Sequence, residues 1–172
     1  NALEVLASLG DERARLALAG LYRRTGHLDR ASRVLERLRL RTADPDIHYR
    51  ATLLLASLSD PAASLELYRE LMADFPYRYQ AYHNAALALM RREDFAGAAA
   101  MVRDCIAACP DLGPSILSDL YVVLGAAQFY GGDPAAATRS FRQAAQLDPE
   151  SDLPGVNLGV IGHAAGQQDK RL

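Results

Sequence analysis

A spaced pattern of residue types recurs along this chain at intervals of roughly 34 residues. A small residue is followed four positions later by a large apolar or aromatic residue, and eight positions after that by proline. Self-similarity at a fixed period indicates an array of similar supersecondary units and not one closed core. The pattern reads Ser64, Tyr68, Pro76; Ala98, Val102, Pro110; Ala137, Phe141, Pro149; and, more weakly, Ala31, Leu35 and the displaced Pro45.

Two further positions recur ahead of each small residue, a turn-type or polar residue and a second small residue. Each unit therefore contains two apolar stripes at helical spacing, separated by a tight turn. No segment alternates apolar and polar residues over a useful length, so we expect helical hairpins and no sheet. The turn positions are Gly26, Ser59, Glu93 and Gly132, and the second small positions are Ala19, Thr52, Ala86 and Gly125.

The small residues have a reason in helix packing. Two helices approach to about 8 Å only where the side chains at their crossing are short. Ala19, Ala86 and Gly125 are therefore expected to face the small residues of the second helices. Proline is expected to end each second helix, because it lacks an amide proton and disfavours helix in the residue before it.

These positions resemble the tetratricopeptide repeat family, whose signature runs Trp-x2-Leu-Gly-x2-Tyr, then Ala-x3-Phe, then Pro. The resemblance covers nearly the whole chain and implies an all-α fold, a right-handed superhelical solenoid of antiparallel helix pairs. It also implies binding of other proteins, since arrays of this kind mostly hold protein partners. The fourth unit matches best, with Tyr121, Leu124, Gly125, Ala137, Phe141 and Pro149.

The pattern assigns residues 1–172 to a single array. Four repeats are expected at 12–45, 46–78, 79–112 and 118–151, with the tail of an earlier repeat at 1–10 and a partial repeat at 152–172. Both ends cut across a repeat, and the apolar, glycine-rich stretch at 157–165 would make a poor capping helix. We therefore expect a segment of a longer protein.

Two departures from the pattern stand out. The step from Ala98 to Ala137 is 39 residues, so we expect a longer loop around residues 111–115 and a lengthened first helix after it. Gln128 stands where the family usually has an aromatic residue, and looser packing is expected there.

Composition limits the classes of function. Half of the residues are hydrophobic and 23% are charged, as in ordinary globular proteins. No apolar run approaches the roughly 18 residues needed to span a bilayer. A net charge of −2 gives no electrostatic case for nucleic acid. We expect neither membrane insertion nor nucleic-acid binding.

The two cysteines, Cys105 and Cys109, lie four positions apart, which is a poor geometry for a disulfide on a helix. Two free thiols favour a reducing compartment such as the cytoplasm. Zinc sites use four ligands, and no histidine or second cysteine pair lies nearby in the sequence. We therefore interpret both residues as structural thiols.

No catalytic motif is visible. The four histidines fall in different units and in no nucleophile, acid-base or metal motif. A stripe of arginines on one second helix favours an anionic ligand, but Asp29 and Glu36 interleave with it, and a solvated face is the preferred interpretation. The sequence predicts no catalytic residue, metal or cofactor. The histidines are His27, His48, His83 and His163, and the arginines of the stripe are Arg30, Arg33, Arg37 and Arg41.

The outer stripe of each first helix is expected to line the inside of the superhelix. Counting from the core positions gives a line of residues for each unit. In the first unit they are Arg13, Leu16, Gly20 and Arg23, and in the second they are Asp46, Tyr49, Leu53 and Ala56.

The middle of this predicted groove is apolar and its edges carry arginines, features typical of interaction sites and their anchors. We expect it to bind an extended peptide or an amphipathic helix with aliphatic anchors and some acidic residues. Alternatively, another part of the parent protein or a second copy fills it. The residues predicted to contact a partner are Arg24, Tyr49, Arg50, Leu53, His83, Asn84, Leu87, Met90, Arg91, Val122, Phe129 and Tyr130.

The sequence thus predicts a non-catalytic protein–protein interaction scaffold or adaptor. Two alternatives stay open. The array could be the targeting or regulatory arm of a larger enzyme such as a transferase. It could also self-associate as an assembly module of secretion or envelope machinery. The sequence does not identify the partner.

Overall fold

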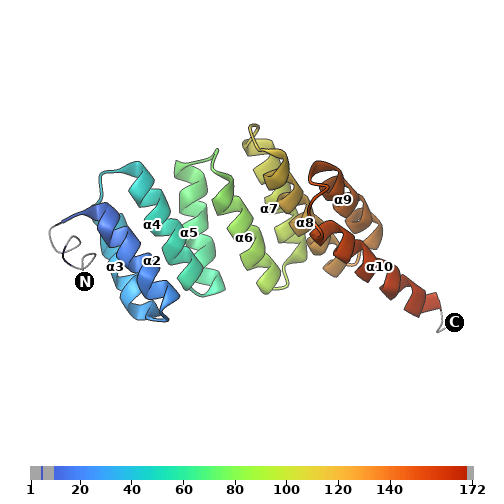
Figure 1. Cartoon of the computed structure of the whole chain (residues 1–172), viewed down its shortest axis with the longest axis horizontal. Coiled ribbons are helices and arrows are strands. Elements are labelled where there is room, and N and C mark those ends of the chain that lie inside the picture. The colour runs from blue at the N-terminus through green and yellow to red at the C-terminus, as the bar shows by residue number, and fades with distance from the viewer. Residues whose placement is uncertain (1–4, 6–9, 170–172) are drawn as a thin grey trace. The chain divides into compact units, whose positions relative to one another are not determined.

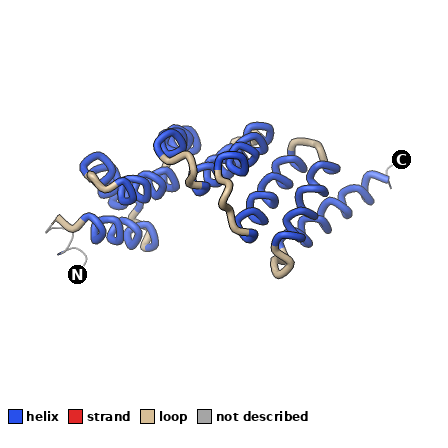
Figure 2. The backbone as a smooth tube through the Cα atoms, turned by 90° about the horizontal axis from the view of Figure 1, so that it is seen from above, coloured by secondary structure: helices blue, strands red, loops and turns tan. Residues whose placement is uncertain are grey.

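The computed structural model describes Val5 and residues 10–169, and this described part contains helices and turns without any strand (Figure 2). The chain divides into two compact units, an N-terminal unit of residues 1–76 and a C-terminal unit of residues 77–172. Most of the expected repeat tail at 1–10 lies outside the described residues.

The N-terminal unit contains α2 (Glu12–Arg24), α3 (Leu28–Arg41), α4 (Pro45–Leu58) and α5 (Pro61–Asp74) (Figure 1). Each helix packs against the next along the chain, and α2 also contacts α4. Their apolar stripes meet in one buried cluster. It consists of Leu16, Ala19, Leu35, Leu38, Ile47, Ala51 and Leu55.

The C-terminal unit contains α6 (Tyr79–Arg91), α7 (Phe95–Ala108), α8 (Pro114–Tyr130), α9 (Pro134–Leu147) and α10 (Leu153–Asp169). Successive helices pack together, and α6 contacts α8 while α8 contacts α10. Its core gathers Ala86, Ala98, Ala99, Val102, Cys105, Cys109, Leu120, Val123, Leu124 and Ala127. The predicted all-α class and the helical hairpins are thereby confirmed.

Aspartate and proline set the helix starts. The side chains of Asp11, Asp44, Asp60, Asp94 and Asp133 each accept a hydrogen bond from a backbone N–H in the first turn of the following helix. These bonds satisfy amide donors that have no partner inside the helix. Proline occupies the start of α4, α5, α8 and α9, where a missing N–H costs nothing.

The turns inside the hairpins follow two designs. Gly26 and Gly132 adopt φ values of 78° and 89°, which glycine reaches without strain. Glu93 occupies the matching position with φ 60°, although it carries a side chain. Ser59 differs, with an extended backbone at φ −86° and ψ 162°.

The α8–α9 hairpin shows why a small residue is needed at the helix crossing. A Cβ built on Gly125 would lie 2.7 Å from Cε1 of Phe141, so the aromatic ring fills the place of a side chain. Ser118 Oγ donates to the carbonyl oxygen of Ala144 at 2.9 Å, which adds a buried link. The expected lengthening of the first helix is present, since α8 has 17 residues where α6 has 13.

Looser packing was expected at Gln128 in the same hairpin. The Oε1 atom of Gln128 instead accepts a hydrogen bond of 2.7 Å from the hydroxyl of Ser140 on α9. The polar side chain is half-buried and links the two helices in place of an aromatic contact.

Candidate partner-binding surface

An open hollow of about 440 Å³ lies between α2 and α4 in the N-terminal unit. We call it the arginine hollow. Helix α2 supplies most of its wall, and α4 supplies the remainder. The lining residues are Arg13, Leu16, Ala17, Gly20, Arg23, Arg24, Arg50 and Leu54.

The hollow follows from the periodicity of α2. One face of the helix is buried, with Ala19 at 0% exposure, while residues three or four apart on the other face reach solvent. Leu16 is 8% exposed and forms the floor. Gly20 leaves room, because a Cβ at this position would meet no heavy atom within 4 Å. All four positions expected in the groove of the first unit line this hollow.

Four of the residues that line the hollow are arginines, namely Arg13, Arg23, Arg24 and Arg50. All four residues are exposed, and none forms an ion pair within the part of the chain that the structure describes. Positive charges gathered around a concavity attract anions, and a guanidinium can bind a carboxylate with two parallel hydrogen bonds. The hollow is therefore suited to acidic groups flanking a small apolar floor.

The prediction for Tyr49 needs correction. Tyr49 is 3% exposed, and its ring meets the ring of Phe75 edge-on at 5.2 Å. Phe75 directly follows α5 and covers the face of α4 that the sequence pattern turned toward the groove. Arg50 and Leu54 line the hollow instead, one position further along the helix than the predicted stripe. Leu53 is half-buried and lies outside the lining.

The predicted contact residues of the C-terminal unit lie on α6 and α8, two helices that contact each other. Leu87 and Met90 are half-buried against the core of this unit. His83, Asn84, Val122 and Phe129 are also half-buried, whereas Arg91 and Tyr130 are exposed.

Tyr130 is the most exposed aromatic residue of this group, at 64%. Its ring stacks on Phe95 with centroids 5.7 Å apart and meets Phe129 edge-on at 5.5 Å. The three rings therefore hold one another at the end of α8 while one of them faces solvent.

The two cysteines behave as structural thiols. Both are buried and free. Burial raises the pKa of Cys105 to about 12, with a smaller contribution from neighbouring Cys109. A reactive cysteine needs a lowered pKa, whereas the pKa of this thiol is raised, so the thiolate form is disfavoured. The pKa of Cys109 is also raised by burial.

The arginine stripe of α3 is exposed, as the solvated interpretation requires. Arg30 lies over the ring of Tyr22, with its guanidinium carbon 5.9 Å from the ring centroid. The backbone carbonyl oxygen of Asp29 accepts a hydrogen bond of 3.2 Å from Arg33 Nε.

Among the described residues, no helix combines the length and the apolar character that crossing a membrane requires. Neither a protein-family model nor a curated protein matches the sequence. Solved structures do match over most of the chain, and the two described next share less than 20% sequence identity with it.

MamA of Desulfovibrio magneticus RS-1, from residue 41 to its end, matches with a TM-score of 0.72 at 19% identity. The match covers 92% of this chain and 88% of that one. PilF of Pseudomonas aeruginosa matches with a TM-score of 0.71 at 17% identity, over 91% of this chain and 69% of that one. Both neighbours are tetratricopeptide-type proteins, so the fold is a tetratricopeptide-like helical solenoid.

Proposed function

We propose that this chain is a non-catalytic interaction scaffold whose arginine hollow binds acidic side chains on a peptide or helix of a partner protein. Folds of this type commonly present a preformed surface, which lowers the ordering cost when a partner docks. The proposal depends chiefly on one observation, the four arginines that line a single concavity and form no ion pair among the described residues.

Charge and shape together support a peptide as the ligand. The floor at Leu16 and Leu54 offers a small apolar contact, while the arginines flank it. An amphipathic segment with acidic residues beside one aliphatic residue would match both features. In the C-terminal unit, half-buried Leu87 and Met90 pack against the core of that unit and are not part of this proposed site.

A fluorescence-anisotropy titration tests the proposal. The probe is a labelled 12-residue peptide that alternates glutamate with leucine, and the control is the same peptide with glutamine for glutamate. We expect the acidic peptide to bind and the neutral one to bind at least about tenfold more weakly, because charge-assisted hydrogen bonds would be lost.

Variants locate the binding site. Arg50→Gln removes one charge from the hollow, and Gly20→Leu fills the hollow from a position where an added Cβ meets no heavy atom within 4 Å. Each should weaken binding about tenfold. Arg33→Gln on α3 is the matched control, because it removes the same charge from an exposed position outside the hollow.

Equal weakening by Arg33→Gln and Arg50→Gln would show non-specific attraction to basic surface and would contradict the proposed site. Unchanged binding in Gly20→Leu would also contradict it. Circular dichroism of each variant establishes that the helices are intact.

A further inference from the structure

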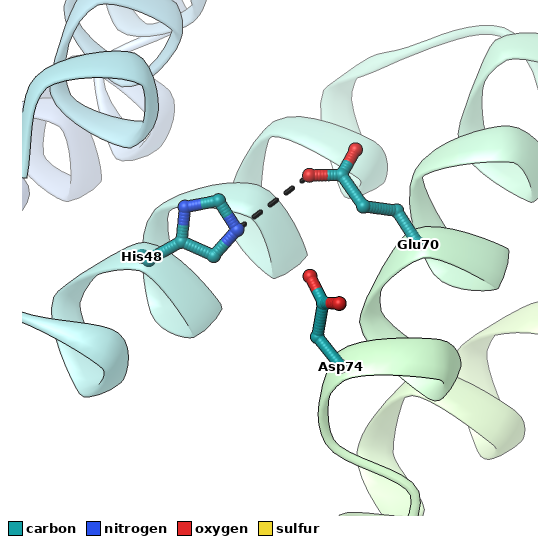
Figure 3. A group of neighbouring side chains, drawn as sticks. All are labelled: His48, Glu70 and Asp74. Carbon is teal, nitrogen blue, oxygen red and sulfur yellow. Dashed lines mark ion pairs between the residues drawn. The ribbon is translucent and has the colours of Figure 1, made fainter.

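A cluster of potential metal ligands lies at one end of the α4–α5 hairpin. Antiparallel pairing brings the first turn of α4, with His48, beside the last turns of α5, with Glu70 and Asp74 (Figure 3). One ligand atom from each of the three residues lies within 4.8 Å of the others. His48 and Glu70 are half-buried, and Asp74 is exposed.

A neighbouring helix orients the imidazole of His48. Its Nδ1 atom lies 3.0 Å from the carbonyl oxygen of Arg39 on α3. A carbonyl oxygen only accepts hydrogen bonds, so Nδ1 carries the proton and donates. The Nε2 atom then faces the carboxylates, 3.5 Å from Glu70 Oε1. Metal-binding histidines commonly donate the second ring N–H to a carbonyl in this way, which fixes the tautomer and the ring orientation.

A bound cation would relieve unfavourable electrostatic interactions of the two carboxylates. Glu70 and Asp74 lie four residues apart on one helix, where like charges repel. They also lie at the C-terminal end of α5, where the helix dipole disfavours negative charge, and the last turn of α5 contains no basic residue.

Arg39 offsets part of this charge. Its Nη2 atom donates to Glu70 Oε2 at 3.1 Å and its Nη1 atom donates to Oε1 at 3.4 Å, while Oε1 also lies 3.5 Å from His48 Nε2. Asp74 forms no ion pair within the described part of the chain. The cluster therefore retains a negative charge when His48 is neutral.

We propose that His48, Glu70 and Asp74 bind one divalent transition-metal ion of the zinc type. Imidazole nitrogen selects zinc and its neighbours over calcium and magnesium, while carboxylates accept both groups of ions. In a tetrahedral zinc site with bonds of about 2.0 to 2.2 Å, the ligand atoms lie about 3.3 Å apart. Side-chain rotation of Glu70 and exposed Asp74 can close the present spacing to that value.

The ion would link α4 to α5, because His48 lies on α4 and the two carboxylates lie on α5. Helix α3 would be joined through the backbone carbonyl of Arg39, which is bonded to His48 Nδ1. Three protein ligands leave a coordination position for water, and exposed Asp74 puts that position on the solvent side. The alternative is an ion pair between protonated His48 and Glu70 that needs no metal. The two differ in their response to zinc and to the charge on Arg39.

The experiment titrates zinc chloride into the purified full chain, without a histidine tag, by isothermal calorimetry and follows the melting temperature. We expect one ion per chain, a dissociation constant in the micromolar range and a rise in melting temperature with zinc. His48→Ala and Asp74→Asn should each weaken binding at least about tenfold. His27→Ala is the matched control, because that histidine lies in the α2–α3 turn.

Arg39→Gln separates the two interpretations. Removing the positive charge beside Glu70 should tighten zinc binding several-fold, whereas a plain ion-pair network would only lose stability and gain no affinity for zinc. Absence of saturable zinc binding overturns the proposal. Equal loss in His27→Ala and His48→Ala, or binding that survives Asp74→Asn unchanged, overturns it as well. Circular dichroism without zinc checks that each variant is folded.

Discussion

The α4–α5 and α8–α9 hairpins follow one plan and hold their helices together by different means. In α8–α9 the ring of Phe141 occupies the space above Gly125, and the buried hydroxyl of Ser118 has a partner. In α4–α5 the position that matches Gly125 is Thr52, which is fully buried. Its Oγ1 atom is the one buried side-chain polar atom in the described part of the chain that lacks a hydrogen-bond partner.

The difference shows which hairpin depends on polar and charged contacts in addition to apolar packing. The α8–α9 hairpin matches the repeat pattern best, and the buried hydroxyls of Ser118 and Ser140 both have hydrogen-bond partners beside the contact of Phe141 with Gly125. The α4–α5 hairpin has an unsatisfied polar core position and a charged network through Arg39, His48 and Glu70 at one end. The α4–α5 hairpin of the N-terminal unit is therefore less completely packed. Both proposed ligand sites lie in the same unit.

Phe141→Ala should give the largest effect, because it removes the ring that fills the α8–α9 crossing. We expect a loss of about 3 to 5 kcal/mol in the free energy of unfolding. Urea unfolding followed by circular dichroism measures the loss. Hydrogen exchange should show it in α8 and α9, and equal loss of protection in α2–α5 would contradict the comparison.

Alkaline pH should weaken the C-terminal unit through Cys105. Its pKa is about 12 in the folded chain against 9.0 for an ordinary thiol, so above pH 9 the unfolded chain releases this proton first. The contribution is complete below pH 9 and is lost as the pH rises toward 12. Stability should fall by up to about 1.4 kcal/mol per pH unit in that window.

Cys105→Ala is the comparison for this pH effect. Urea unfolding of both proteins between pH 8 and 11 should show a shallower decline in the variant. Parallel declines would mean that other groups produce the alkaline loss.

Thr52→Val should bring the α4–α5 hairpin closer to the apolar design of α8–α9. The side chains have the same shape, and the variant removes a buried hydroxyl that has no partner among the described residues. We expect a gain of about 1 kcal/mol in unfolding free energy. Thr52→Ser keeps the hydroxyl and serves as the control. A destabilised Thr52→Val variant would show that the hydroxyl is satisfied in solution.

Glu93→Gly should give the smallest effect by making the α6–α7 turn equivalent to the turns at Gly26 and Gly132. A residue with a side chain is strained at a φ of 60°, and glycine is not. We expect a gain of about 0.5 to 1 kcal/mol, measured by urea unfolding. Glu93→Ala keeps the strain and should show no such gain.

The sequence predicted the helix pairs well because small, large and proline positions are local requirements of each hairpin. The four residues that it expected in the groove on α2 line the arginine hollow. On α4 the residues that line the hollow lie one position after the predicted ones. The reason is that Phe75, which covers Tyr49, lies outside the repeat pattern. Whether an arginine has an acidic partner depends on tertiary contacts, so the free charges of the hollow could not be derived from spacing.

The cluster of His48, Glu70 and Asp74 was missed for a related reason. Sequence motifs for metals place ligands close together in the chain, whereas these residues come from opposite ends of two helices. A usable signal was present, since two acidic residues four apart at the end of a second helix lie beside the start of the first helix of the same hairpin.

The helix contacts described for each unit join helices that are one or two apart along the chain. Only short loops must close before these contacts form, which keeps the entropic barrier low. Chains with mainly local contacts fold in microseconds to milliseconds. During synthesis, α2 and α3 can therefore bury their shared stripe as soon as both have left the ribosome, and within each unit a later helix packs onto helices that have already formed.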